Sequence, residues 1–283
     1  MNTIEKDFNC TRDIINGSSL TDEYYNSIYF HSNEHLKDIF GQIDVKGKKC
    51  LSVLGSGDQA FYMFDRDAES VDLFDINKLA IYYYYLRVWA IKYLDRFYPD
   101  NYIDKDFVLN LLRYVKVSNK LEKFAYDYWM KYAYGFENYK KDILEGLFII
   151  GNNPYLNKLD DLSRVKSRLN DCINFFNMDL SDENIPREKK YDIIYTSNII
   201  DYLHSLYRIS VYRHNLSDLL NDDGMIVVTH VTNSYRKGEE ALLFDRYFDV
   251  KELDKVYHDY EYKCPGYVYT KKNKKGGSLK WLI

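Results

Sequence analysis

The chain has 283 residues, of which 46% are hydrophobic and 29% are charged, and its formal net charge is −4. This composition excludes fibrous and intrinsically disordered proteins, and the length allows one large domain or one domain with an insertion. The negative charge gives no overall basic footprint for nucleic acid, so we expect no nucleic-acid partner.

Neither a secretory signal nor a membrane span is predicted. The first residues carry acidic side chains and no apolar run, and the apolar stretch at 81–91 is interrupted by Arg87 and too short to cross a bilayer. The four cysteines are scattered without a Cys-x-x-Cys pair, so no metal site or redox motif is indicated. These features predict a cytoplasmic protein with reduced thiols.

The first third of the chain begins with a polar segment and then changes to strands that alternate with helices. Residues 1–45 predict a helical cap. The expected elements are, in order, helices at 20–28 and 35–40, a strand at 48–54, a helix at 59–64, a strand at 71–75 and a helix at 78–96.

Residues 99–170 interrupt this alternation with long helix-forming stretches, and we interpret them as a helical insertion. Its expected elements are helices at 107–115, 121–134 and 139–148, a break at 151–154 and a helix that ends at 169. The aromatic stretch at 126–136 has two interpretations, the wall of an acceptor pocket or part of the core, and helical spacing of aromatic residues favours the core.

Alternation resumes after the insertion. The expected elements are strands at 172–178 and 191–196, a helix at 205–220, a turn at 221–224, a strand at 225–229, a helix at 239–247, and strands at 250–257 and 267–271. Strands that alternate with helices predict an α/β fold with a largely parallel sheet covered on both faces. The expected α/β domain therefore comprises residues 46–98 and 171–283.

A glycine turn between the first strand and its helix is the first feature that points to a ligand. Gly55 and Gly57 let the backbone turn sharply and approach a ligand, and the helix offers free N–H groups. Asp75 ends the next strand, where a carboxylate accepts hydrogen bonds from ribose hydroxyls. The pattern fits S-adenosylmethionine (SAM), but Gly55-x-Gly57-x-x-Ala60 also matches the dinucleotide fingerprint of NAD(P) proteins.

Three later features favour SAM over NAD(P). Asp179 ends the third expected strand, where methyltransferases commonly place an acid or amide against the adenine amine. Residues 191–198 resemble the fourth-strand motif of SAM-dependent methyltransferases, and 219–228 resemble the helix, polar turn, glycine and strand of their fifth strand. The two closing strands suit the antiparallel seventh strand of the class I methyltransferase fold, a Rossmann-like sheet of seven strands.

Several segments together resemble a largely uncharacterised bacterial family of this fold, related to the betaine-lipid enzymes that transfer the 3-amino-3-carboxypropyl group of SAM. The resemblance spans nearly the whole chain. The segments that carry it are 28–34, 51–60, 71–77, 153–156 and 197–203. The resemblance implies SAM binding, with either the methyl or the aminocarboxypropyl group transferred.

By position, the resemblance implies a set of cofactor-binding residues. Those expected to line the methionine and ribose are Gly55, Ser56, Gly57 and Asp58. Asp75 would hold the ribose, with Ile76 and Asn77 beside the adenosine. Asp179 and Leu180 would face adenine, and Ser197 and Asn198 would lie below the sulfonium. Gln59 departs from the pattern, because many methyltransferases have glycine there.

Residues that follow the fourth strand are the candidates for catalysis. They are expected to border the cleft and are Asn198, Asp201, Tyr202 and His204. Asp201 or His204 would serve as a general base and Tyr202 would orient substrate; helix caps or surface positions are the alternative. Glu34 would fold over the cofactor as a lid, or satisfy N–H groups at a helix start.

The predicted function is SAM-dependent methyl transfer to a small-molecule or lipid-like acceptor, because methyl transfer is the commonest use of the fold. Aminocarboxypropyl transfer is the rival, drawn from the family resemblance. A non-catalytic sensor of SAM or an adenosine ligand is a third hypothesis. A homodimer is left open.

Overall fold

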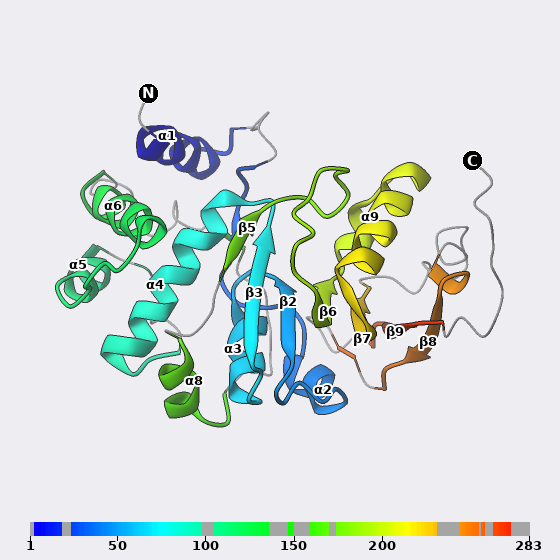
Figure 1. Ribbon diagram of the computed structural model, residues 1–283. Coiled ribbons are helices and arrows are strands. Elements are labelled where there is room, and N and C mark those ends of the chain that lie inside the picture. Colours follow the sequence, from blue (N-terminus) through cyan, green and yellow to red (C-terminus); the bar gives the residue numbers. More distant parts are fainter. Residues whose placement is uncertain are drawn as a thin grey trace.

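The computed structural model describes residues 3–18, 24–97, 103, 105–135, 147–149, 159–169, 174–230, 244–254, 256–257 and 263–272. Within this part of the chain, a seven-stranded sheet is covered by helices on both faces (Figure 1). The described residues also form a two-stranded sheet.

The strand order of the large sheet identifies the fold. Its strands, in chain order, are β2 (Lys49–Val53), β3 (Ser70–Asp75), β5 (Phe175–Asn177), β6 (Tyr191–Ser197), β7 (Leu220–Thr229), β8 (Phe248–Glu252) and β9 (Gly266–Lys271). They lie in the order β5-β3-β2-β6-β7-β9-β8. All neighbouring pairs from β5 to β7 are parallel, and β9 is antiparallel to both β7 and β8. In chain order β7 is the fifth strand of this sheet and β9 is the last, and β9 lies antiparallel between β7 and β8. This is the arrangement of class I SAM-dependent methyltransferases, so the predicted fold is confirmed.

Alternation of side chains along the central strands builds a core on each face. Cys50 and Ile193 belong to the hydrophobic cluster on one face, together with side chains of α3 (Asp58–Asp65) and α4 (Lys78–Leu94). Their neighbours Leu51 and Ile194 belong to the cluster on the other face, with α9 (Leu206–Leu219). Successive residues of a strand point to opposite faces, so these apolar runs bury both sides of a parallel sheet.

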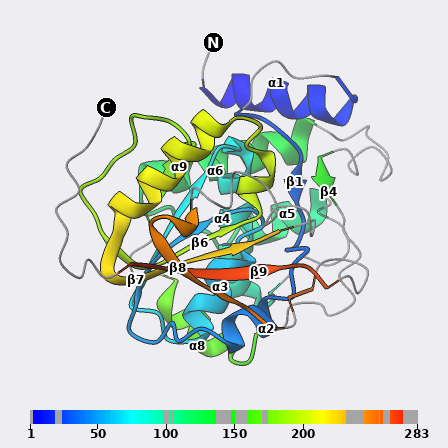
Figure 2. The same ribbon diagram turned by 90° about the vertical axis from the view of Figure 1, so that its right-hand side faces the viewer.

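The amino-terminal region differs from the sequence prediction. A helix, α1 (Thr3–Ile15), precedes the expected one at 20–28, whose described part has no helix and ends in β1 (Ile28–Tyr29). β1 pairs in parallel with β4 (Phe148–Ile149) (Figure 2). The Ile28 N–H also donates to the carbonyl of Leu147. The expected helix at 139–148 lies outside the described residues except for its last two, and these take part in this long-range pairing. The expected helix at 35–40 is confirmed as α2 (Leu36–Gly41).

Buried Asp7 fastens α1 to the rest of the molecule. Its carboxylate accepts hydrogen bonds from the hydroxyls of Tyr25 and Tyr82, both at 2.5 Å, and from Lys78 Nζ at 2.8 Å. Tyr82 and Lys78 belong to α4, whereas Tyr25 lies just before β1. The anchor therefore fixes the start of the segment that leads into β1.

The helices of the expected insertion pack on α4. They are α5 (Lys105–Leu112), α6 (Lys120–Gly135) and α8 (Leu162–Arg168), which confirms the expected helices at 107–115 and 121–134. Trp129 of α6 is fully buried and donates to the Tyr82 carbonyl, so the described part of the aromatic stretch contributes to the core. The break at 151–154 lies outside the described residues. These helices share one hydrophobic cluster with α4. The division of the chain into a cap (1–45), an α/β domain (46–98 and 171–283) and an insertion (99–170) stays a prediction.

The carboxy-terminal elements follow the expected order with shifted ends. α9 confirms the helix at 205–220 and is capped by Ser205, whose hydroxyl accepts from the Arg208 N–H. The expected turn at 221–224 is a bulge at the start of β7, because Tyr191 pairs with Leu220 and Ile193 with Met225. The expected helix at 239–247 lies mostly outside the described residues. Among the described helices, none has the length and apolar character that crossing a lipid bilayer would require.

Candidate cofactor site

A cavity of about 400 Å³ opens at the carboxyl ends of β2, β3 and β6. The strand order reverses at β2, which lies between β3 on one side and β6 on the other. In open α/β sheets, ligands bind at this reversal. The segment 26–33, which leads into and out of β1, supplies another wall of the cavity.

The turn between β2 and α3 brings backbone into the cavity. Gly55 and Gly57 have φ values of 49° and 89°, the left-handed region that favours glycine. A Cβ atom at Gly57 would lie 2.6 Å from the ring of Tyr84, so a larger residue there would collide with α4. Gly55 and Ser56 line the cavity, whereas Gly57 is the N-cap of α3 and does not line it.

A buried ion pair holds this turn in place. Arg87 and Asp58 are both 0% exposed and lie 2.6 Å apart. Arg87 Nη1 also donates to the Ser56 carbonyl at 2.7 Å, and Asp58 accepts from the Ser56 hydroxyl and from the Ser32 N–H at 2.6 Å. The guanidinium lies over the ring of Phe61, 4.9 Å from its centre. Asp58 therefore fixes both the glycine turn and the segment 26–33, and it does not line the cavity.

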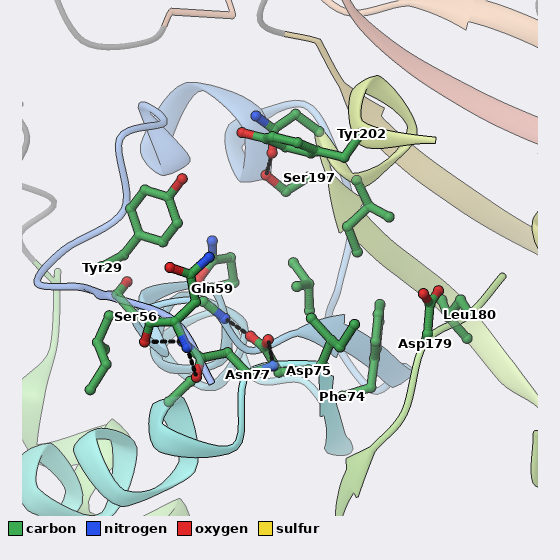
Figure 3. A pocket seen from close by; sticks show the side chains of 18 of the residues that line it. Tyr29, Ser56, Gln59, Phe74, Asp75, Asn77, Asp179, Leu180, Ser197 and Tyr202 are labelled. Atoms are coloured by element: carbon green, nitrogen blue, oxygen red, sulfur yellow. Dashed lines mark hydrogen bonds between the residues drawn. The ribbon is translucent and has the colours of Figure 1, made fainter. Parts of the chain in front are cut away.

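Asp75 presents its carboxylate to the cavity from the end of β3 (Figure 3). One oxygen accepts from the Gly55 N–H at 2.9 Å and the other from the Asn77 N–H at 2.7 Å. Burial raises the pKa of Asp75 to about 6, although these N–H groups act in the opposite direction. Each carboxylate oxygen has a further lone pair, so the group can accept hydrogen bonds from a pair of ligand hydroxyls.

Asn77 joins the start of α4 to the segment 26–33. As the N-cap of α4, its Oδ1 accepts from the Leu79 N–H, and its Nδ2 donates to the carbonyls of Asn26 at 3.0 Å and Ser27 at 3.2 Å. Both Asn26 and Ser27 line the cavity. One side chain thus caps a helix and fixes a cavity wall.

We expect Asn77→Ala to lower the free energy of unfolding by about 1–2 kcal/mol, because it removes a helix cap and three further hydrogen bonds to Asn26 and Ser27. Urea denaturation measures this loss. Asn119→Ala is the matched control for a cap outside the cavity lining, since Asn119 Oδ1 accepts from the Glu122 N–H at the start of α6. Equal ligand affinity in the two variants would contradict a role of Asn77 in the cavity wall.

Apolar side chains and an ion pair form the other end of the cavity. The apolar residues there are Val53, Phe74, Ile76, Met178 and Leu180. Asp179 lies two residues beyond β5 and pairs with Arg208 of α9, and both line the cavity. Arg208 Nε and Asp179 each also contact the hydroxyl of Ser181. The acid expected to face adenine is therefore held by a cation, a partner that the sequence did not indicate.

The floor of the cavity beside β6 contains a buried carboxylate. Glu34 is 0% exposed and accepts hydrogen bonds from the hydroxyls of Ser197, at 2.9 Å, Tyr195 and Thr229. Ser197 lines the cavity and has a φ of 52°, an uncommon value for a residue with a side chain that is often found at functional sites. The half-exposed ring of Tyr202 lies over Ser197 (Figure 3). Glu34 thus supports Ser197 from below and is not positioned as a lid.

The structure brings together most of the residues expected from sequence. Those that line the cavity are Gly55, Ser56, Asp75, Ile76, Asn77, Asp179, Leu180, Ser197, Asn198 and Tyr202. Those outside its lining are Gly57, Asp58, Glu34, Asp201 and His204. Asp201 Oδ1 lies 2.7 Å from Nδ1 of buried His230, and His204 is exposed, so neither candidate base faces the cavity.

Sequence reasoning missed a second group of lining residues. They include Asn26, Ser27, Tyr29, Ser32, Asn33, Gln59 and Arg208. Asn26 and Ser27 were missed because a helix was expected at 20–28. Tyr29, Ser32 and Asn33 lie in the segment 28–34, which the family resemblance had marked without assigning these residues to the site. Within the described residues, no group of three or more His, Cys, Asp or Glu side chains could hold a metal ion.

No family model matches the chain, and no curated protein matches it. Solved structures do align with it over most of its length.

A ribosomal protein L11 methylase from Lactobacillus delbrueckii subsp. bulgaricus is 12% identical, over 82% of this chain and 74% of that chain, with a TM-score of 0.40. The N-methyltransferase NodS from Bradyrhizobium japonicum WM9, in complex with S-adenosyl-L-homocysteine, is 7% identical over 83% of each chain, with a TM-score of 0.40. A TehB-like SAM-dependent methyltransferase from Corynebacterium glutamicum is 12% identical, over 95% of this chain and 98% of that chain, with a TM-score of 0.38.

Proposed function

We propose that the protein binds SAM in this cavity and transfers the SAM methyl group to a small-molecule or lipid-like acceptor. The observation that carries the proposal is the Asp75 carboxylate, which lies in the cavity at the end of β3 and accepts the Gly55 N–H. At this position of an α/β sheet, an acid recognises the two hydroxyls of a ribose.

The remaining lining residues fit the other parts of SAM. The apolar side chains of Phe74, Met178 and Leu180 suit an adenine ring, and the polar turn at Gly55 and Ser56 suits the amino-acid part. The cavity volume of about 400 Å³ is within the range of small-molecule sites, roughly 300–1,000 Å³.

Two features disfavour NAD(P). A dinucleotide places its pyrophosphate against the glycine turn and the helix that follows. Here the amide side chain of Gln59 takes up space near Gly55, because a Cβ atom at Gly55 would lie 3.8 Å from Gln59 Nε2. Among the described lining residues, the one Lys or Arg is Arg208, which pairs with Asp179 and not with the glycine turn.

Positioning is what the protein contributes to the reaction. Bound SAM supplies a methyl group activated by a sulfonium. Ser197, Asn198 and Tyr202 border the cavity beyond the Asp75 end and would align an acceptor for in-line displacement. We assign no general base to Asp201 or His204, because neither lines the cavity. A cytoplasmic location and a homodimer stay predictions.

By-product analysis tests which group is transferred. The protein is incubated with SAM and a fraction of small molecules and lipids from bacterial cells, and the adenosine-containing products are identified by mass spectrometry. Methyl transfer predicts S-adenosylhomocysteine (SAH), and methylthioadenosine instead would indicate aminocarboxypropyl transfer. SAM binding without either product, in every fraction tested, would favour the sensor.

We expect the affinity for SAM to fall as the pH is lowered from 7 to 5. The free protein holds Asp75 with a raised pKa of about 6, and only the ionised carboxylate accepts hydrogen bonds with both oxygens. Ligand hydroxyls favour the charged form, so affinity is constant well above pH 6 and falls about tenfold per unit below it. Titration calorimetry at half-unit intervals measures the profile, and constant affinity from pH 5 to 7 would contradict it.

A further inference from the structure

Gln59 is the residue at which this chain departs from the usual glycine of the loop, and its side chain is buried at the cavity. The side chain is 4% exposed and lines the cavity from the first turn of α3. Figure 3 draws Gln59 and Ser56 at one end of the cavity, with Asp179 and Leu180 at the other.

The carbonyl oxygen of this side chain lacks a partner. Gln59 Oε1 is buried and has no hydrogen-bond partner among the described residues. The neighbouring polar side chains are already engaged, because Ser56 donates to Asp58 and Asp58 pairs with Arg87. A buried carbonyl without a donor is unfavourable, and native structures retain such groups where a ligand or another partner satisfies them.

The charges around Gln59 favour a cationic donor. The carboxylate of Asp75 lies on the other side of Gly55, whose N–H it accepts. Among the described lining residues, Arg208 is the one Lys or Arg, and it pairs with Asp179 at the far end. A positively charged group near Gln59 would therefore lie close to the Gln59 carbonyl oxygen and to the Asp75 carboxylate. The one lining Lys or Arg of the described residues is at the far end of the cavity and would not repel it.

We propose that the Gln59 side-chain carbonyl accepts a hydrogen bond from the α-ammonium group of the amino-acid part of the cofactor. This inference rests on the proposed function and extends it, because it assigns recognition of the amino-acid end to a residue outside the usual glycine pattern. Gln59 then discriminates ligands that carry an α-amino group from adenosine compounds that lack one.

Calorimetric titration with two ligands tests the assignment. SAH carries the α-amino acid, whereas 5′-methylthioadenosine has the same adenosine and thioether without it. We expect Gln59→Leu to weaken SAH binding about 10- to 100-fold, the effect of losing a hydrogen bond to a charged group, and to change methylthioadenosine binding less than about threefold. Gln59→Glu keeps an acceptor oxygen and is expected to retain SAH affinity.

Three outcomes would overturn the assignment. Equal losses for both ligands in Gln59→Leu would mean that Gln59 only shapes the loop. Weaker SAH binding by Gln59→Glu than by Gln59→Leu would mean that the amide nitrogen donates to the ligand carboxylate. Binding of neither ligand by the unmodified protein would remove the proposed function together with this inference. Thermal melting of each variant verifies folding, and the leucine variant is expected to melt no lower than the parent.

Discussion

Asp75→Asn is expected to weaken SAM binding by at least about 100-fold, or about 2.7 kcal/mol. Hydrogen bonds to a charged group contribute roughly 1.5–3 kcal/mol each, and the carboxylate is proposed to accept two from the ribose. The amide would also direct its NH₂ group at either the Gly55 or the Asn77 N–H, which now donate to the two carboxylate oxygens. Titration calorimetry at pH 7.5, where the carboxylate is ionised, measures the loss.

Asp72→Asn provides the matched control, because it makes the same chemical change in the same strand. Asp72 is buried, does not line the cavity, and accepts from Lys189, Tyr191 and Asn174. We expect this variant to lose stability and to keep SAM affinity within about threefold, since its contacts are remote from the ligand. Equal losses of affinity in both variants would show that any buried change in β3 disturbs the cavity, and Asp75 would lose its assigned role.

Arg87→Met is expected to lower the free energy of unfolding by about 3–5 kcal/mol, because it leaves Asp58 buried without its counter-ion. The change also removes the donor to the Ser56 carbonyl, so SAM binding should weaken as well. Urea denaturation followed by circular dichroism measures the stability.

Lys166→Met is the control for the loss of an ordinary ion pair. Lys166 and Asp95 lie 2.7 Å apart, but their side chains are 39% and 74% exposed. Such a surface pair contributes about 0–1 kcal/mol. The double variant Arg87→Met/Asp58→Asn should recover part of the stability, since no buried charge remains. A loss below about 1 kcal/mol for Arg87→Met would contradict the anchoring of the turn by this pair.

The central strands could be predicted from sequence because burial on both faces of the sheet leaves a local signature. β2, β3 and β6 are short, largely buried strands. Gly55 follows β2 closely, whereas β3 and β6 end in Asp75 and Ser197, and these strand ends predicted the cavity at the edge of the sheet. Residues at the carboxyl ends of adjacent parallel strands must lie near one another, whatever the helices do.

The wall at 26–33 could not be predicted, because contacts distant in sequence determine its structure. Ile28 pairs with Phe148, and the carbonyls of Asn26 and Ser27 accept from Asn77. Local patterns carry no information about such partners, and the start of this wall fell within the helix expected at 20–28.

The roles of the buried acids could not be predicted for the same reason. Asp58 was expected to line the methionine and ribose, and Glu34 to act as a lid or to satisfy N–H groups at a helix start. Arg87, 29 residues from Asp58, and Ser197, 163 residues from Glu34, instead bind their carboxylates. Asp75 differs because backbone N–H groups of its own neighbourhood orient it, and its position at a strand end was sufficient to identify it. Strand ends were therefore predictable from sequence, and side-chain pairing across the core was not.

Titration of the unmodified protein with SAM, SAH and NADH at pH 7.5 tests the central claim most directly. The account predicts that SAM and SAH each bind one site with dissociation constants on the order of 1–100 µM, the usual range for substrates of enzymes, and that NADH gives no saturable heat. Saturable binding of NADH alone, or no binding of SAM and SAH at millimolar concentration, would contradict the assignment of the cavity to SAM.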